Sequence, residues 1–193
     1  MKIKQYPKNK IEALNEGIIE QIIEVAKDSF GKSMGGEEII EHVLPTDHLY
    51  LAFDSNNGLI GFCTDVYRDG ATYFAGAAVK NNCQGNGVYQ KLLSSRLNNL
   101  VQRRERMLEF CTQNPKVEKG ICMALEREID LGNLVNYNLE RKIEKRLYGR
   151  MLTEKRLFSG NLKIDKIFAK LNLEIGDGFS YKIELVYTGK QIV

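Results

Sequence analysis

The sequence has few of the residues that build metal sites. Its four cysteines, Cys63, Cys83, Cys111 and Cys122, are far apart in the chain, form no CxxC motif and are accompanied by only two histidines. Structural zinc sites bring such residues together in closely spaced pairs. We therefore expect no metal centre, and we expect the cysteines to be reduced and mostly buried thiols.

Long apolar runs and an excess of one charge are also missing. No segment approaches the roughly 20 apolar residues that a membrane-spanning helix needs, and the N-terminal sequence MKIKQYPKNK lacks the apolar core of a signal peptide. The 28 basic and 25 acidic residues are scattered and leave a net charge of +3, so no polyanion-binding surface is indicated. These absences predict a soluble cytoplasmic protein that binds no membrane, with nucleic acid as a minor hypothesis.

The first half of the chain changes from helical to β character. A short strand is predicted at residues 2–6, and helices are predicted at 15–31 and 35–45 from isoleucines at helical spacing. Residues 48–79 then contain three β-rich runs separated by NNG and RDG, which are turn sequences that tolerate positive φ. This pattern indicates an antiparallel meander of three strands.

A glycine-containing loop, NNCQGNGVY at residues 81–89, follows the meander. The next segment, residues 88–104, carries one apolar stripe at helical spacing. After it comes MLEFCT, a short apolar run bounded by QNP, which we expect to be a central strand parallel to the strand before the helix. The order is strand, loop, helix, strand.

The last third of the chain is expected to be mainly helical. One helix is predicted from Lys116 to Glu128, and a second, after the break at Gly132 and Asn133, from apolar residues four apart. That apolar stripe consists of Val135, Leu139, Ile143, Leu147 and Met151. It must be buried, either on its own domain or against a second copy in a homodimer, and both remain open. The alternating FSYKIELVYTG near the end predicts a last strand.

The glycine loop is the motif most suggestive of binding. A loop that enters a helix exposes the first backbone N–H groups of that helix, which together with the helix dipole bind anionic phosphate oxygens. Gly85 and Gly87 would let a ligand approach the backbone, although glycines also relieve strain in turns that bind nothing. A P-loop is excluded because no Lys-Ser or Lys-Thr pair follows the glycines. A dinucleotide fingerprint is disfavoured because it requires glycine or alanine where Gln90 stands.

In its wider context, VKNNCQGNGVYQKLL resembles the acetyl-CoA signature of the GCN5-related N-acetyltransferase (GNAT) superfamily. That signature is Gln or Arg, two residues, Gly, one residue, and Gly or Ala. Gln84, Gly87 and Tyr89 stand at these positions, and the tyrosine is a departure. The element order over residues 1–120 is similar as well.

The resemblance implies an α/β (α+β) fold with a mixed, mainly antiparallel sheet flanked by helices. A central parallel pair of strands would be splayed around acyl-CoA. The chain would form a single acyl-CoA N-acyltransferase domain, residues 1–193, in which residues 126–165 are a helical addition.

The resemblance also implies acetyl-CoA as co-substrate, with no metal. The backbone of Ala78 and Val79 would carry the pantetheine arm, and Asn114 matches a position that touches the pantetheine or orients the active site. The alternative for Asn114 is a helix cap before a proline. The residues expected around the pyrophosphate are Gln84, Gly85, Asn86, Gly87, Val88 and Tyr89.

The implied reaction moves an acetyl group to a primary amine, on a small molecule or on a protein lysine or N-terminus, by direct attack in a ternary complex. Glu109 is a candidate base because it interrupts an apolar strand, where a carboxylate must be exposed, paired or functional. Glu118 is a candidate acid, near where many relatives place a tyrosine, or else a solvated helix residue. A noncatalytic acyl-CoA-binding regulatory module is the alternative function.

Overall fold

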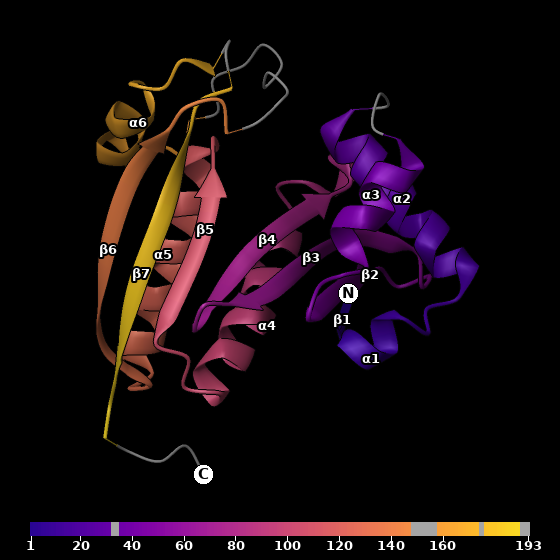
Figure 1. Ribbon diagram of the computed structural model, residues 1–193, viewed down its shortest axis with the longest axis horizontal. Helices are drawn as coiled ribbons and strands as arrows, with labels where there is room; N and C mark the ends of the chain where they lie inside the picture. Colours follow the sequence, from indigo (N-terminus) through magenta and orange to yellow (C-terminus); the bar gives the residue numbers. More distant parts are fainter. Residues whose placement is uncertain (32–34, 148–157, 174–175, 190–193) are drawn as a thin grey trace. The chain divides into compact units, whose positions relative to one another are not determined.

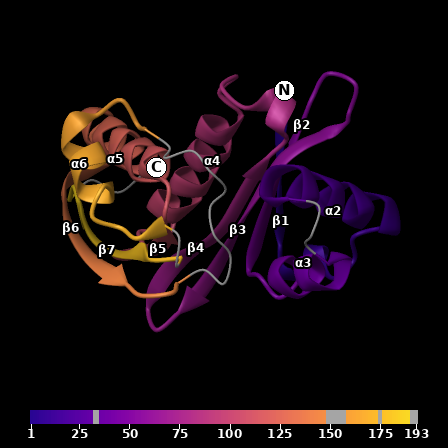
Figure 2. The ribbon, with the colours of Figure 1, turned by 90° about the horizontal axis from the view of Figure 1, so that it is seen from above.

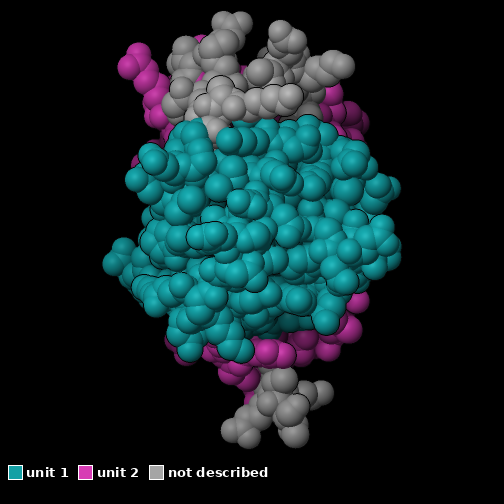
Figure 3. Space-filling view, turned by 90° about the vertical axis from the view of Figure 1, so that its right-hand side faces the viewer, with its two compact units in different colours: residues 1–99 teal, residues 100–193 magenta. Residues whose placement is uncertain are grey.

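The computed structural model describes residues 1–31, 35–147, 158–173 and 176–189. It divides into two compact units, residues 1–99 and residues 100–193, which are coloured separately in Figure 3. We describe each unit by itself. The prediction of a single acyltransferase domain stays a prediction.

Unit 1 contains an antiparallel sheet of four strands, seen in Figure 1. The strands pair in the order β1 (Lys2–Pro7), β2 (His48–Phe53), β3 (Leu59–Arg68) and β4 (Ala71–Val79). The predicted meander is confirmed. Residues with positive φ form its turns, as the NNG and RDG sequences required.

Three helices cover one face of this sheet, and a fourth begins on the other face (Figure 2). The first three are α1 (Lys8–Ile11), α2 (Glu16–Phe30) and α3 (Gly36–Val43), of which α1 is a single turn that the sequence pattern did not reveal. They pack on the apolar side chains of β2 and β3. The amphipathic helix α4 (Val88–Gln102) places Val88 and Leu92 in a second cluster, with Tyr50 and Cys63 from the opposite face of the sheet.

The described residues of unit 2 form three strands, the helices α5 and α6, and the end of α4. The strand β7 (Gly178–Tyr187) pairs antiparallel with β5 (Met107–Thr112) on one side and with β6 (Leu134–Glu144) on the other. The helix α5 (Pro115–Asp130) lies along one face of these strands, with α6 (Leu162–Phe168) beside it (Figure 2). The α/β (α+β) class predicted for the chain, with mainly antiparallel strands flanked by helices, is therefore confirmed.

The predicted helix beginning near Leu134 is wrong, because Leu134–Glu144 is the strand β6. Residues four apart share a face in a strand as well as in a helix, so the apolar spacing fitted both. Pairing with β7 decides for the strand. Met151 lies outside the described residues. The described part of the predicted helical addition consists of the end of α5, the strand β6 and the start of α6.

In the single chain the stripe is largely exposed, since Val135 is 57% accessible and Ile143 is 41% accessible. Its burial on its own domain is therefore wrong for these residues, and burial against a second copy stays a prediction. None of the helices in the described parts of the chain combines the length and the apolar character needed to cross a membrane.

Candidate functional site: the loop before helix α4

The glycine loop connects the end of β4 to α4. It begins with a short 3-10 turn, η1 (Asn81–Cys83), and continues through Gln84 to Gly87. Gly85 and Gly87 have φ angles of 78° and 76°, a left-handed conformation that side chains other than glycine rarely adopt. A Cβ placed at either glycine would meet no atom within 4 Å. Backbone conformation, and not crowding, therefore requires these glycines, and the space beside them is open.

Hydrogen bonds divide the loop's main-chain N–H groups into two sets. In the first half of the loop, Asn81 N donates to Asp28 Oδ2 and Cys83 N donates to Lys80 O. Among the described main-chain hydrogen bonds, Gln84 N is the last donor of the loop and Lys91 N, which donates to Gly87 O, is the first of the helix. The N–H groups from residue 85 to residue 90 are thus available to an anion at the positive end of the helix dipole.

The signature glutamine braces the loop from within. Gln84 Nε2 donates to Val79 O and to Asn81 Oδ1, each over 3.1 Å. Val79 O also accepts from Ser29 Oγ at 2.7 Å. Both lone pairs of this carbonyl are therefore engaged, so a pantetheine arm on Ala78 and Val79 would have to use other backbone groups.

Tyr89, the departure from the family pattern, packs its side chain against the cluster of β2, β3 and α4 residues. Burial raises the pKa of its hydroxyl to about 12. The side chain is partly buried against the core of unit 1, which accommodates the bulk of the tyrosine. The sequence pattern alone could not show this.

Gly61 in β3, which no sequence motif singled out, lets β4 and the first turn of α4 lie close to β3. A Cβ on Gly61 would lie 2.9 Å from Ala78 O and 3.2 Å from Val88 Cγ1. Glycine inside a strand often marks such a close approach of another backbone. The glycine could be seen in the sequence, but only the structure shows that β4 and α4 are the elements that approach it.

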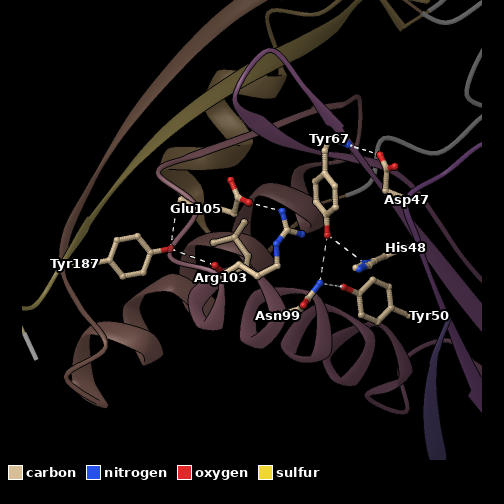
Figure 4. A network of polar contacts seen from close by, with 9 residues as sticks. Asp47, His48, Tyr50, Tyr67, Asn99, Arg103, Glu105 and Tyr187 are labelled. Atoms are coloured by element: carbon tan, nitrogen blue, oxygen red, sulfur yellow. Dashed lines mark hydrogen bonds and ion pairs between the residues drawn. The ribbon is translucent and has the colours of Figure 1, made fainter. Parts of the chain in front are cut away.

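Polar side chains fix α4 on the sheet of unit 1. Arg96 Nε donates to Asp65 Oδ1 at 2.6 Å and Arg96 Nη2 donates to Thr64 O at 2.6 Å. Figure 4 shows a second set, in which Asn99 Nδ2 donates to Tyr50 Oη at 2.9 Å. These contacts orient the helix whose first turn carries the candidate anion site.

The remaining candidate residues belong to unit 2. Asn114 is the N-cap of α5, with its Oδ1 accepting from Lys116 N at 2.9 Å, so the capping interpretation is confirmed. A contact between Asn114 and pantetheine stays a prediction. Glu109 is half-buried on β5, in register with Lys182 of β7. Its role as a base also stays a prediction.

Glu118 is buried under α5 and fully engaged. Its carboxylate accepts from Arg141 Nη2 at 2.6 Å and from Tyr181 Oη at 2.5 Å. Both oxygens accept hydrogen bonds, and this arrangement ties α5 to β6 and β7. It does not favour Glu118 as a proton donor to a thiolate, and it is also unlike a solvated helix residue.

The cysteines are free thiols, as expected, but only Cys63 is buried. Cys111 and Cys122, which were expected in the core, are half-buried together with Cys83. Within the described residues, no group of three or more His, Cys, Asp or Glu side chains could hold a metal ion.

Comparisons with known proteins find similarity in structure but not in sequence. No protein-family model and no curated protein matches the chain. Solved structures do match, and over nearly its whole length. The ribosomal-protein-S18-alanine N-acetyltransferase of Escherichia coli has a TM-score of 0.58 at 9% identity, with coverage of 100% of this chain and 99% of that one.

Two further matches were solved with ligand. An acetyltransferase of Bacillus subtilis in complex with CoA has a TM-score of 0.58 at 14% identity, covering 96% of this chain and 99% of that one. A GNAT family acetyltransferase of Elizabethkingia anophelis with acetyl-CoA bound has a TM-score of 0.52 at 16% identity, covering 96% and 98%. The chain has the GNAT fold.

The GNAT resemblance inferred from the glycine loop and the element order is thus confirmed at the level of the fold. Identities of 9% to 16% carry the fold and no more. The segment that resembles the GNAT signature lies between the meander and the amphipathic helix α4 in the structure.

Proposed function

We propose that the protein is an acetyltransferase that moves an acetyl group from acetyl-CoA to a primary amine. The observation that carries the proposal is the loop before α4, where open space surrounds two left-handed glycines and a row of main-chain N–H groups has no acceptor within the helix. The GNAT fold, with matched structures solved with CoA or acetyl-CoA, supports it.

In the proposed complex, the N–H groups from Gly85 to Gln90 hold the pyrophosphate of the co-substrate. The amine attacks the thioester carbonyl directly. A C–N bond forms, the C–S bond breaks, the amine loses a proton and the departing thiolate gains one. Direct attack needs no cysteine, which suits a chain whose thiols are not paired with an activating histidine in any motif.

The acceptor amine is left as a class, either a small molecule or the lysine or N-terminus of a protein. Glu37, Glu38 and Glu41 give α3 an acidic surface that would favour a cationic acceptor.

Calorimetry of the wild type and of Gly87→Glu with CoA tests the proposal. The substitution places a carboxylate in the open space where the phosphates belong, and we expect binding to become undetectable. Gly70→Glu is a matched control, because Gly70 has the same φ of 76° and the same open surroundings but lies in the β3–β4 turn. Equal CoA affinity in the wild type and Gly87→Glu would contradict the site.

Activity needs a separate experiment, because a noncatalytic acyl-CoA-binding module would also pass the binding test. A panel of amines, polyamines and lysine peptides, with detection of the free CoA thiol, should show turnover with at least one acceptor. Turnover should vanish in Gly87→Glu and persist in Gly70→Glu. Binding without turnover on any acceptor would replace the enzyme by the regulatory module.

A further inference from the structure

The last turn of α2 holds the start of the glycine loop. Asp28 Oδ2 accepts from Asn81 N at 2.5 Å, and Asn81 Nδ2 donates back to Asp28 O at 2.6 Å. One residue further along, Ser29 Oγ donates to Val79 O at 2.7 Å. Three hydrogen bonds thus join α2 to a segment about 50 residues away in sequence.

The position of Asp28 is unfavourable for the helix itself. A carboxylate near the C-terminal end of a helix lies at the negative end of the helix dipole, where lysine or arginine is preferred. It also stands next to a loop proposed to bind an anion. The carboxylate accepts a hydrogen bond from Asn81 N, whereas the bond from Asn81 Nδ2 goes to the main-chain oxygen of residue 28, which any residue would supply. The contact with Asn81 N is therefore the one that favours an acidic side chain at this position.

We propose that Asp28, assisted by Ser29, is a positioning residue for the acyl-CoA loop. By accepting from Asn81 N, Asp28 fixes the residue at which the loop begins. The hydrogen bonds of Cys83 N and Gln84 N then follow in the 3-10 turn, and the N–H groups of residues 85–90 are not donors in the described main-chain hydrogen bonds. This inference rests on the proposed function for its ligand, but its contacts are those of the free protein.

Because Asp28 and Asn81 are both exposed, their hydrogen bonds contribute little to the overall stability of unit 1. Removing the carboxylate of Asp28, and with it the hydrogen bond from Asn81 N, should loosen the loop without unfolding the protein. By the reciprocity of linked equilibria, a ligand that holds the loop should in turn protect the last turn of α2.

The first test measures amide hydrogen exchange in the free protein. In Asp28→Ala we expect the amides of residues 81–84 to exchange at least about fivefold faster, the equivalent of one lost hydrogen bond of about 1 kcal/mol. The amides of β2 should be unchanged. Unchanged exchange at residues 81–84 would overturn the proposal, and this result does not depend on any ligand.

The second test measures CoA affinity by calorimetry in four variants. Asp28→Ala should weaken binding about fivefold to tenfold, and Ser29→Ala should weaken it less. Asp28→Asn keeps an acceptor oxygen for Asn81 N and removes the negative charge, so it should bind within about twofold of the wild type or more tightly. Glu24→Ala, which removes an exposed carboxylate from the same helix, should not change the affinity.

Two outcomes of the second test would overturn the positioning role. One is wild-type affinity in Asp28→Ala, and the other is the same loss in Asp28→Asn as in Asp28→Ala. Failure of the wild type itself to bind CoA would instead remove the proposed function, while the exchange experiment would still decide whether Asp28 positions the loop.

Discussion

Each unit buries a carboxylate against an arginine beneath a helix, but the two pairs are built differently. In unit 1, Asp65 and Arg96 are joined at 2.6 Å, and their side chains are only 1% and 3% exposed. Arg96 Cζ also lies over the ring of Phe74, 3.8 Å from the ring centroid. In unit 2, Glu118 is equally buried, but the side chain of its partner Arg141 is 29% exposed.

The difference lies in how each arginine is kept charged. The side chain of Arg96 is shielded from solvent, so Asp65, Thr64 O and the face of Phe74 must together offset its desolvation. Arg141 keeps contact with solvent, and Glu118 has a second donor in Tyr181. Loss of Arg96 would therefore leave the Asp65 carboxylate buried without a cation. Loss of Arg141 would leave Glu118 with its hydrogen bond from Tyr181.

Removal of Arg96 is expected to have the largest effect on stability and tests the difference between the two ion pairs most strongly. Arg96→Met leaves the Asp65 carboxylate buried without its cation, and we expect the free energy of unfolding to fall by about 3 to 5 kcal/mol in urea titrations. The double variant Arg96→Met/Asp65→Leu removes both charges and should recover most of the loss. A loss below about 1 kcal/mol, or a double variant as unstable as the single one, would show that the pair is not desolvated as described.

A smaller effect is expected from Arg141→Met. The carboxylate of Glu118 keeps its hydrogen bond from Tyr181, and water can approach from the side that Arg141 occupied. We expect a loss of about 2 kcal/mol, typical of a hydrogen bond to a charged group. The measurement is the same urea titration, and a loss as large as that of Arg96→Met would remove the distinction between the two pairs.

A third effect, absent at neutral pH, concerns the alkaline limb of stability in unit 1. Burial raises the pKa of the Cys63 thiol to about 12, above its ordinary value of 9.0. A pKa raised by folding contributes stability that is present below pH 9 and is lost as the pH rises through 12. Cys63→Ala should therefore flatten the fall in unfolding free energy between pH 9 and pH 12 by up to about 1.4 kcal/mol per pH unit.

Urea titrations at several pH values give that slope, and Cys111→Ala is a control with a half-buried thiol in unit 2. Identical slopes in the wild type and Cys63→Ala would mean that the thiol titrates as it does in the unfolded chain.

Local patterns predicted much of this fold. The apolar residues of α2 and α4 have a spacing that fits a helix, and the turn sequences of the meander separate its strands. These elements formed as expected. The prediction for β6 was wrong because its apolar residues are four apart, a spacing that fits a helix as well as a strand. Its partner β7 also lies about 40 residues further along the chain. Pairing at that distance leaves no mark in a local pattern.

The candidate site was predictable to the same extent. The loop and its glycines could be found because a left-handed backbone requires glycine at a fixed place. The supports of the loop could not. Asp28 is one acidic residue among several on an amphipathic helix, and only the folded chain brings it to Asn81. Glu118 was chosen because it lies near where many relatives place a tyrosine, but its partners Arg141 and Tyr181 come from the strands β6 and β7, which no local pattern connects to it.

The central claim is that the N–H groups at the start of α4 bind the phosphates of acyl-CoA. Backbone amide chemical shifts, followed by two-dimensional NMR while CoA is added, test it most directly. The account predicts that the largest shift changes fall on residues 85–90, with smaller changes at Asn81 and in the last turn of α2, and that none of them occurs in Gly87→Glu. Changes that cluster elsewhere in the chain and leave residues 85–90 unmoved would contradict it.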